Sequence, residues 1–136
     1  MIKMLITGGA GFIGGNFVHY TAKNHPEYEL TIIDALTYAG DIKTLESVKD
    51  RITFVQGDIC DKGLMNKLVS EVDIIVHFAA ESHNDNSLHN PWPFIQANLI
   101  GTATILEAVR KYGKRLHHIS TDEVYGDLKL NDPTKF

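Results

Sequence analysis

The sequence contains a single cysteine, Cys60, so the chain cannot form an internal disulfide. No spacing of this cysteine with the seven histidines is typical of a zinc site. Unpaired thiols are usual in reducing compartments. We therefore expect a cytoplasmic protein that holds no metal.

The sequence also lacks a long apolar run and an excess of basic residues. No apolar stretch is long enough to cross a bilayer, and the start of the chain has neither the basic segment nor the apolar core of a signal peptide. The formal net charge is -4, which gives no attraction to a phosphate backbone or to an anionic membrane. We expect no nucleic acid and no membrane among the partners.

What the sequence does contain is a regular alternation of strand and helix patterns. Of its 136 residues, 43% are hydrophobic and 22% are charged, as in a globular domain. The short apolar runs are MLIT (4–7), LTIID (30–34), ITFV (52–55), DIIVHF (73–78) and RLHHIS (115–120). Such near-continuous runs are typical of strands buried on both faces of a parallel sheet, with crossover helices on both sides. The sequence predicts an α/β fold with a doubly wound parallel sheet, in one domain over residues 1–136.

A long helix is predicted from about Asn90 to Tyr112. Pro91 is favoured in a first helical turn, and Gly113 is a typical residue after a helix end. The helix has two apolar stripes. One stripe is Ile95, Leu99, Thr102, Leu106 and Val109, and the other is Phe94, Ala97, Gly101, Ile105, Ala108 and Tyr112. One stripe can cover the sheet, so the other needs a second partner.

The segment TGGAGFIG (7–14) follows the first predicted strand and opens a helix that is predicted to end by Asn24. Glycines let a turn adopt positive φ and approach a pyrophosphate, and the following helix N-terminus favours negative charge. The alternative is a tight turn that binds nothing. The predicted cofactor contacts here are Gly8, Gly11, Phe12, Ile13 and Gly14.

Two acidic residues follow the second and third strands. Asp34 stands where a carboxylate can accept hydrogen bonds from the adenosine ribose and repel a 2'-phosphate, which favours NAD over NADP. An ordinary strand-end aspartate that caps the next turn is the alternative. Asp58, with Ile59 beside it, is placed to reach the adenine, and a plain turn residue is the alternative.

Ligands of open α/β sheets lie beyond the carboxyl ends of the strands. Small residues follow the fourth strand, and Ala79, Ala80 and Ser82 are predicted to lie against the cofactor. The next strand ends in Ser120 and then Thr121, Asp122 and Glu123. Both acids can face one ligand only if the chain has left the strand by Asp122. The alternative is that Asp122 caps the next element and Glu123 is solvated.

Several motifs together resemble the extended short-chain dehydrogenase/reductase family, over essentially the whole chain. They are TGGAGFIG, Asp34 with LTYAG, GDI (57–59), AAESHNDNS (79–87), NLIGT (98–102) and STDEVYGD (120–127). Within that family the Thr-Asp-Glu triplet is similar to that of the dehydratases acting on dTDP-glucose. The resemblance implies a Rossmann-like NAD-binding domain, a separate C-terminal substrate lobe, and deoxysugar synthesis as the usual setting.

The resemblance also implies roles for the triplet in a three-step dehydration. Glu123 would remove the C5 proton, Asp122 would protonate the departing C6 hydroxyl, and Thr121 would hold the C4 oxygen. Substrate contacts are implied for Ser82, His83 and Asn86, although these polar residues also fit a hydrated loop. His77, His117 and His118 have apolar neighbours, and we interpret them as core or edge histidines.

The family takes the C4 hydroxyl proton with a tyrosine from a Tyr-x-x-x-Lys helix that follows this segment. We expect that helix and the substrate lobe to lie beyond Phe136, and none of the tyrosines present to replace it. The chain would then be an incomplete N-terminal part, inactive alone, of an enzyme that is a homodimer at full length. Another nucleotide-sugar dehydratase or a 4-epimerase is one alternative, and a non-catalytic NAD-binding module is a second.

Overall fold

A computed structural model shows five parallel strands covered by helices on both faces, and it describes residues 1–126. The strands are β1 (Ile2–Thr7), β2 (Tyr28–Asp34), β3 (Ile52–Gln56), β4 (Ile74–His77) and β5 (Arg115–His118). The α-helices are α1 (Phe12–Asn24), α2 (Lys62–Ser70), α3 (Asn84–His89), α4 (Trp92–Phe94) and α5 (Thr102–Tyr112). Two 3₁₀ segments, η1 (Ile42–Arg51) and η3 (Asp122–Tyr125), and a π-helical segment, η2 (Ile95–Gly101), complete the described part.

The strand order is β3-β2-β1-β4-β5. Each of the four neighbouring pairs is parallel, and Leu5 of β1 lies between Thr31 of β2 and Ile75 of β4. The order reverses direction at β1, which is the switch point of a doubly wound sheet. The predicted α/β architecture is confirmed.

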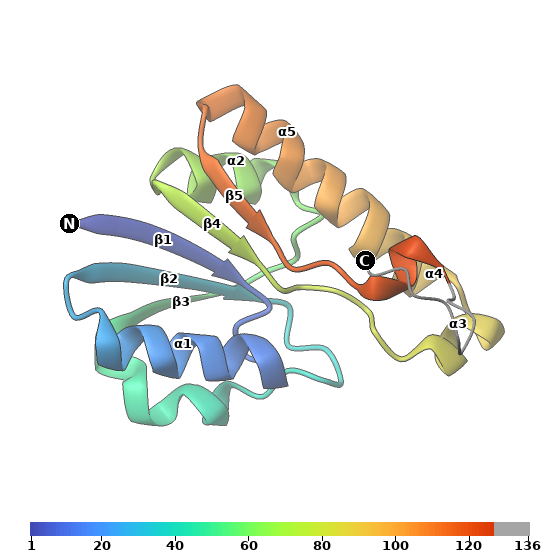
Figure 1. The fold of residues 1–136 in the computed structure, drawn as a ribbon, viewed down its shortest axis with the longest axis horizontal. Helices are drawn as coiled ribbons and strands as arrows, with labels where there is room; N and C mark the ends of the chain where they lie inside the picture. The colour runs from blue at the N-terminus through green and yellow to red at the C-terminus, as the bar shows by residue number, and fades with distance from the viewer. Residues whose placement is uncertain (127–136) are drawn as a thin grey trace, which may run out of the picture.

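Two apolar cores flank the sheet. One face packs Met4, Ile6 and Leu30 against α1 and η1, and the other packs Leu5 and Ile75 against α2 and α5. Figure 1 shows the same division, with α1 on one side of the strands and α2 and α5 on the other. Burial of both faces accounts for the nearly continuous apolar runs of the strands.

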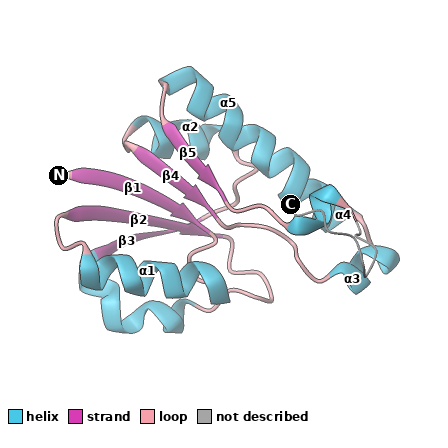
Figure 2. Cartoon of the chain, viewed as in Figure 1, coloured by secondary structure: helices cyan, strands magenta, loops and turns pink. Residues whose placement is uncertain are grey.

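All five strands end on one side of the molecule, and the loops leave the sheet there (Figure 2). Each parallel crossover returns the chain to the opposite side, so residues that follow different strands collect at a common edge. This carboxyl edge carries the glycine turn, Asp34, Asp58, the segment 79–83 and the triplet 121–123. Residues distant in sequence are thereby brought to one surface.

The predicted long helix is present, but it is not uniform. Helical backbone angles continue through Phe94 and Thr102, so α4, η2 and α5 form one rod that ends at Gly113 with φ 61. The middle of the rod is π-helical, which sequence periodicity did not predict. A Cβ on Gly101 would overlap the Ile59 side chain, so this glycine lets Ile59 pack directly on the rod.

One stripe of this rod is covered, and the other is covered incompletely. Gly101, Ile105 and Ala108 are buried against the sheet and α2. On the opposite stripe, Leu99 is 65% exposed and Leu106 is 49% exposed. The expectation that one apolar stripe would lack cover within this chain is met in the described residues.

Candidate functional site

The glycine turn after β1 requires glycine for two separate reasons. Gly8 has φ 70, and its N–H donates to the carbonyl of Ile33 over 2.8 Å. A Cβ on Gly8 would also lie 2.7 Å from the backbone nitrogen of Ala79. A Cβ on Gly14 would collide with the carbonyl oxygen of Gly8. The turn is therefore packed backbone against backbone, with no room for side chains.

Helix α1 begins at Phe12, and its N-cap residue Gly11 has no side chain to accept from the first turn. The first N–H groups of an α-helix have no partner within the helix, so they and the helix dipole face outward at this edge. Phe12 is 87% exposed and Ile13 is 65% exposed. Two large apolar side chains beside the first N–H groups of a helix are suited to a ligand with both a charged and an apolar part.

Asp34 holds the loop after β2 and the glycine turn together. One carboxylate oxygen accepts from the Ala10 N–H and the other from the Leu36 N–H, both over 2.9 Å. Leu36 has φ 53, an unusual value for a branched residue, and the Asp34 bond stabilises that conformation. Gly40 lies so close that its Cβ would be 2.8 Å from an Asp34 oxygen. Asp34 is therefore a turn cap, and each oxygen still has a second acceptor site.

The loop after β3 places the two predicted adenine contacts differently. Asp58 is exposed, and its carboxylate accepts from the Cys60 N–H over 2.8 Å. The Ile59 side chain is buried in the core, which leaves only its backbone for a ligand. Cys60 donates its thiol proton to the Gln96 carbonyl over 3.2 Å. Burial, and then the neighbouring Asp58, raise the pKa of the Cys60 thiol to about 11.

The segment after β4 is fixed by a residue that the sequence analysis did not single out. Asn98 of η2 accepts from the Glu81 N–H over 2.8 Å and donates to the Glu81 carbonyl over 2.9 Å. This reciprocal pair holds the peptide of Glu81 against the rod. Ala80 and Ser82, on either side of it, are exposed.

Tyr38 connects the loop after β2 with the segment after β4. Its hydroxyl donates to Glu81 over 3.1 Å, and it also bonds to Nδ1 of His83 over 2.9 Å. Because the hydroxyl has one hydrogen, it accepts from His83, which places a proton on Nδ1. Desolvation, with further contributions from Glu81, raises the pKa of Tyr38. The bridge leaves Nε2 of His83 for other contacts.

A polar loop was predicted around His83, but residues Asn84–His89 form a short helix, α3. The prediction of a loop is therefore wrong. Asn86 lies within the helix, and its carbonyl accepts from the Asn90 N–H over 3.0 Å. Asparagine, aspartate and serine favour turns over helices, which is why the local sequence predicted a loop. Asp85 and Asn86 are exposed.

The acid pair has left strand β5, as its proposed chemistry requires. The strand ends at His118, and Asp122 begins η3. Thr121 caps η3, because its hydroxyl accepts from the Glu123 N–H and donates to Asp122, each over 3.3 Å. Thr121, Asp122 and Glu123 are all exposed. The start of η3 and its N-cap residue therefore expose all three side chains.

The Tyr-x-x-x-Lys spacing does occur once in the chain, at Tyr125 and Lys129. Tyr125 ends η3, and the next residue, Gly126, has φ 79 and ψ -169. That conformation ends the 3₁₀ segment directly after Tyr125. Lys129 lies outside the described residues.

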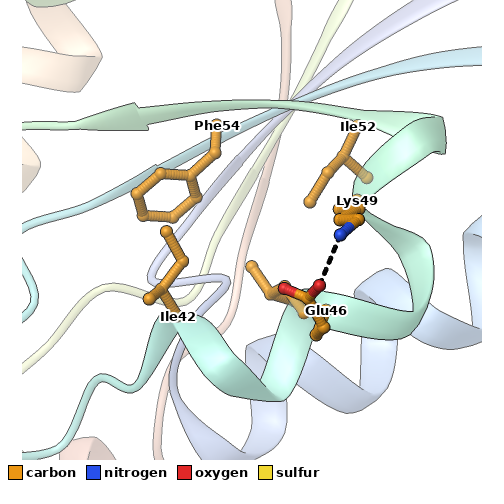
Figure 3. A pocket seen from close by; sticks show the side chains of 6 residues that line it. Ile42, Glu46, Lys49, Ile52 and Phe54 are labelled. Carbon is orange, nitrogen blue, oxygen red and sulfur yellow. Dashed lines mark hydrogen bonds and ion pairs between the residues drawn. The ribbon is translucent and has the colours of Figure 1, made fainter.

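A hollow of about 360 Å³ lies elsewhere, between η1 and edge strand β3 (Figure 3). It is lined by Ile42, Leu45, Glu46, Lys49, Ile52 and Phe54, and an ion pair joins Lys49 to Glu46 across its rim. None of the predicted cofactor residues contributes to it. Within residues 1–126, no helix is long and apolar enough to pass through a membrane.

The switch-point sheet and the glycine turn define a Rossmann-like domain. Residues 5–135 match the family model described as GDP-mannose 4,6 dehydratase. The chain belongs to this family. A dTDP-glucose 4,6-dehydratase of Mycobacterium tuberculosis is 61% identical to it over 135 residues, which are 99% of this chain and 41% of that protein.

Solved structures agree with this assignment. The dTDP-glucose 4,6-dehydratase of Bacillus anthracis, in complex with NAD, is 41% identical and matches 99% of this chain and 42% of its own with a TM-score of 0.86. That of Streptomyces venezuelae, also with NAD bound, is 44% identical over 94% of this chain and 42% of its own, with a TM-score of 0.87. The chain thus spans about two fifths of the relatives that it matches.

Proposed function

We propose that this chain is the NAD-binding part of an enzyme that dehydrates dTDP-glucose to dTDP-4-keto-6-deoxyglucose. The observation that carries the proposal is the triplet Thr121-Asp122-Glu123, exposed beyond β5 on the sheet edge that also bears the glycine turn and Asp34. The names of the similar proteins support the substrate.

The residues at the edge fit a dinucleotide. Gly8 and Gly14 let the turn pack tightly in front of α1, and the first N–H groups of α1 would bond to a pyrophosphate. Asp34 would accept from the adenosine ribose with its remaining lone pairs, and Asp58 and Ile59 would border the adenine. Ala79, Ala80 and Ser82 would line the path toward the nicotinamide. When bound, NAD supplies the hydride acceptor for C4 oxidation and the hydride returned to C6.

The chain's own residues would move the protons. Glu123 would take the C5 proton, which a C4 ketone makes acidic, and Asp122 would protonate the C6 oxygen as it leaves. Thr121 would orient the C4 oxygen through its hydroxyl. Ser82, His83 and Asn86 would contact the sugar nucleotide at the same edge. His83 would use Nε2, because its Nδ1 is held by Tyr38.

The test uses the chain joined to the C-terminal part of its Mycobacterium tuberculosis relative. We expect this protein to form the 4-keto product from dTDP-glucose, and Glu123→Gln to abolish the product while C4 oxidation continues. GDP-mannose and UDP-glucose are the comparison substrates. Faster conversion of either one would reject dTDP-glucose as the substrate.

The same proposal includes a homodimer in the longer protein. The uncovered stripe with Leu99 and Leu106 gives each subunit an apolar surface, and a second copy of the rod can cover it. The free Cys60 supports a cytoplasmic location. Light scattering of the joined protein, compared with a Leu99→Lys variant, tests the dimer, and a monomeric parent would contradict it.

A further inference from the structure

His77 is a polar side chain enclosed in the sheet just below the carboxyl edge. It is 1% exposed and lies beside Thr7 in the β1–β4 register. Both ring nitrogens have partners. Nδ1 is 2.7 Å from the Thr7 hydroxyl oxygen, and Nε2 is 3.1 Å from the Thr102 hydroxyl oxygen. Each hydroxyl can donate or accept, so the tautomer of this buried histidine depends on the other bonds that its partners make.

The Thr7 hydroxyl favours one of the two tautomers. This hydroxyl accepts from the Ala79 N–H over 3.2 Å, and Nδ1 of His77 is within reach of its own hydrogen at 2.7 Å. When the hydroxyl donates to Nδ1, the ring proton is on Nε2, which faces the Thr102 hydroxyl. Burial, and then repulsion from His118, lower the pKa of His77 to about 4, in keeping with a neutral ring.

The chain of bonds joins three elements around the edge. Thr7 directly precedes Gly8, and Gly8 packs on the backbone nitrogen of Ala79 without space for a Cβ. The Thr7 hydroxyl therefore fixes the glycine turn relative to the end of β4. On the other side, Thr102 begins α5 directly after η2, whose Asn98 holds Glu81. The segment 79–81 is held by Thr7 at Ala79 and by Asn98 at Glu81. His77 bonds to Thr7 and to Thr102 of the rod that carries Asn98, so it connects these two attachment points.

We propose that His77, as the neutral Nε2–H tautomer, is a positioning residue that sets the spacing between the glycine turn and Ala79 for dinucleotide binding. This rests on the proposed NAD site. His77 does not touch the ligand. Its effect passes through the buried Thr7 hydroxyl to Ala79, which is half-buried at the carboxyl edge and lies against Gly8.

The decisive variants are a matched pair at Thr7. Thr7→Val keeps the shape but removes the hydroxyl, which leaves the Ala79 N–H and Nδ1 of His77 without this partner. Thr7→Ser keeps the hydroxyl and loses a methyl group. A buried hydrogen bond left unmade costs enough to change a binding constant by about tenfold. We expect the NAD dissociation constant to rise about tenfold in the valine variant and to stay within about twofold in the serine variant.

Thr21→Val is the control, because Thr21 is also buried but its hydroxyl bonds to the Phe17 carbonyl within α1. We expect this variant to leave NAD affinity unchanged even if its unfolding midpoint shifts. Titration calorimetry with NAD measures all four proteins, and thermal unfolding shows that each is folded. A merely structural role for Thr7 would let the valine variant bind NAD as tightly as its parent, and that result would overturn the proposal.

A second measurement reads the tautomer directly. In ¹⁵N spectra at neutral pH, we expect the proton of His77 on Nε2 and an unprotonated Nδ1, with loss of the single tautomer in Thr7→Val. A proton on Nδ1 would overturn the proposal even if NAD binds. If the parent chain bound no NAD, the proposed function would fail and the positioning role with it, whereas NAD binding with no Thr7→Val effect would reject the positioning role alone.

Discussion

Removal of the Asp34 carboxylate is expected to change both cofactor choice and the shape of the site. In the unmodified chain we expect NAD to bind more tightly than NADP, because Asp34 repels a 2'-phosphate and accepts from the ribose. In Asp34→Ala the difference between the binding free energies of NAD and NADP is expected to shrink by about 1–3 kcal/mol, which is the contribution of hydrogen bonds to a charged group. Most of this change should come from weaker NAD binding, because the same carboxylate also holds Ala10 and Leu36.

The structural part of this prediction has its own magnitude. Ala10 is buried, so its N–H loses a charged acceptor with no water to replace it, whereas the Leu36 N–H is only half-buried. We expect Asp34→Ala to lower the free energy of unfolding by about 1.5–3 kcal/mol. Asp34→Asn, which retains one amide oxygen, is expected to lose less stability and less NAD affinity.

The assay is calorimetric titration with both dinucleotides, paired with urea unfolding of each variant. Asp61→Ala is the control, because Asp61 caps α2 by accepting from the Leu64 N–H over 3.0 Å. Loss of that cap is expected to cost about 1 kcal/mol of stability and to leave cofactor preference unchanged. Equal affinities of the unmodified chain for NAD and NADP would refute the role of Asp34, as would an Asp34→Ala variant with unchanged preference.

Three further predictions concern catalysis, association and the turn. In the joined protein, Glu123→Gln is expected to slow solvent deuterium exchange at C5 of the substrate by at least about 100-fold, and exchange at the parental rate would make Glu123 a bystander. The 136-residue chain alone is expected to self-associate through the stripe around Leu106 and to convert no dTDP-glucose, as light scattering over a dilution series and a product assay would report. A stable monomer would contradict the expected self-association. Gly8→Ala is expected to abolish NAD binding and destabilise the fold by more than Gly113→Ala, because both positions have positive φ but only Gly8 abuts other backbone. Equal destabilisation in urea unfolding would contradict the packing argument.

The sequence predicted the features that depend on residues close together in the chain, namely strands, helix ends and a turn. Apolar runs located the strands, the ends of two helices at Asn24 and before Gly113 were predicted, and glycine spacing located the turn after β1. Asp34 was predicted either to face a ribose or to cap a turn. The structure shows the cap, and the ribose contact stays a prediction.

The remaining features depend on contacts between distant segments. Asn98 pairs with a residue 17 positions away, and Tyr38 with one 43 positions away. No periodicity encodes such pairs, because the packing of the rod and the two loops creates them. The π-helical segment was not predicted either, because its residues fit an ordinary α-helical pattern.

The contact between Cys60 and Gln96 has a consequence for redox chemistry. The reactive form of cysteine is the thiolate, and a thiol with a pKa of about 11 is ionised in only about one molecule in ten thousand at pH 7. Oxidants and alkylating reagents would therefore attack this side chain slowly. The single thiol of the chain, half-buried and hydrogen-bonded to Gln96, is therefore expected to react more slowly with oxidants than the low-pKa cysteines of redox sensors.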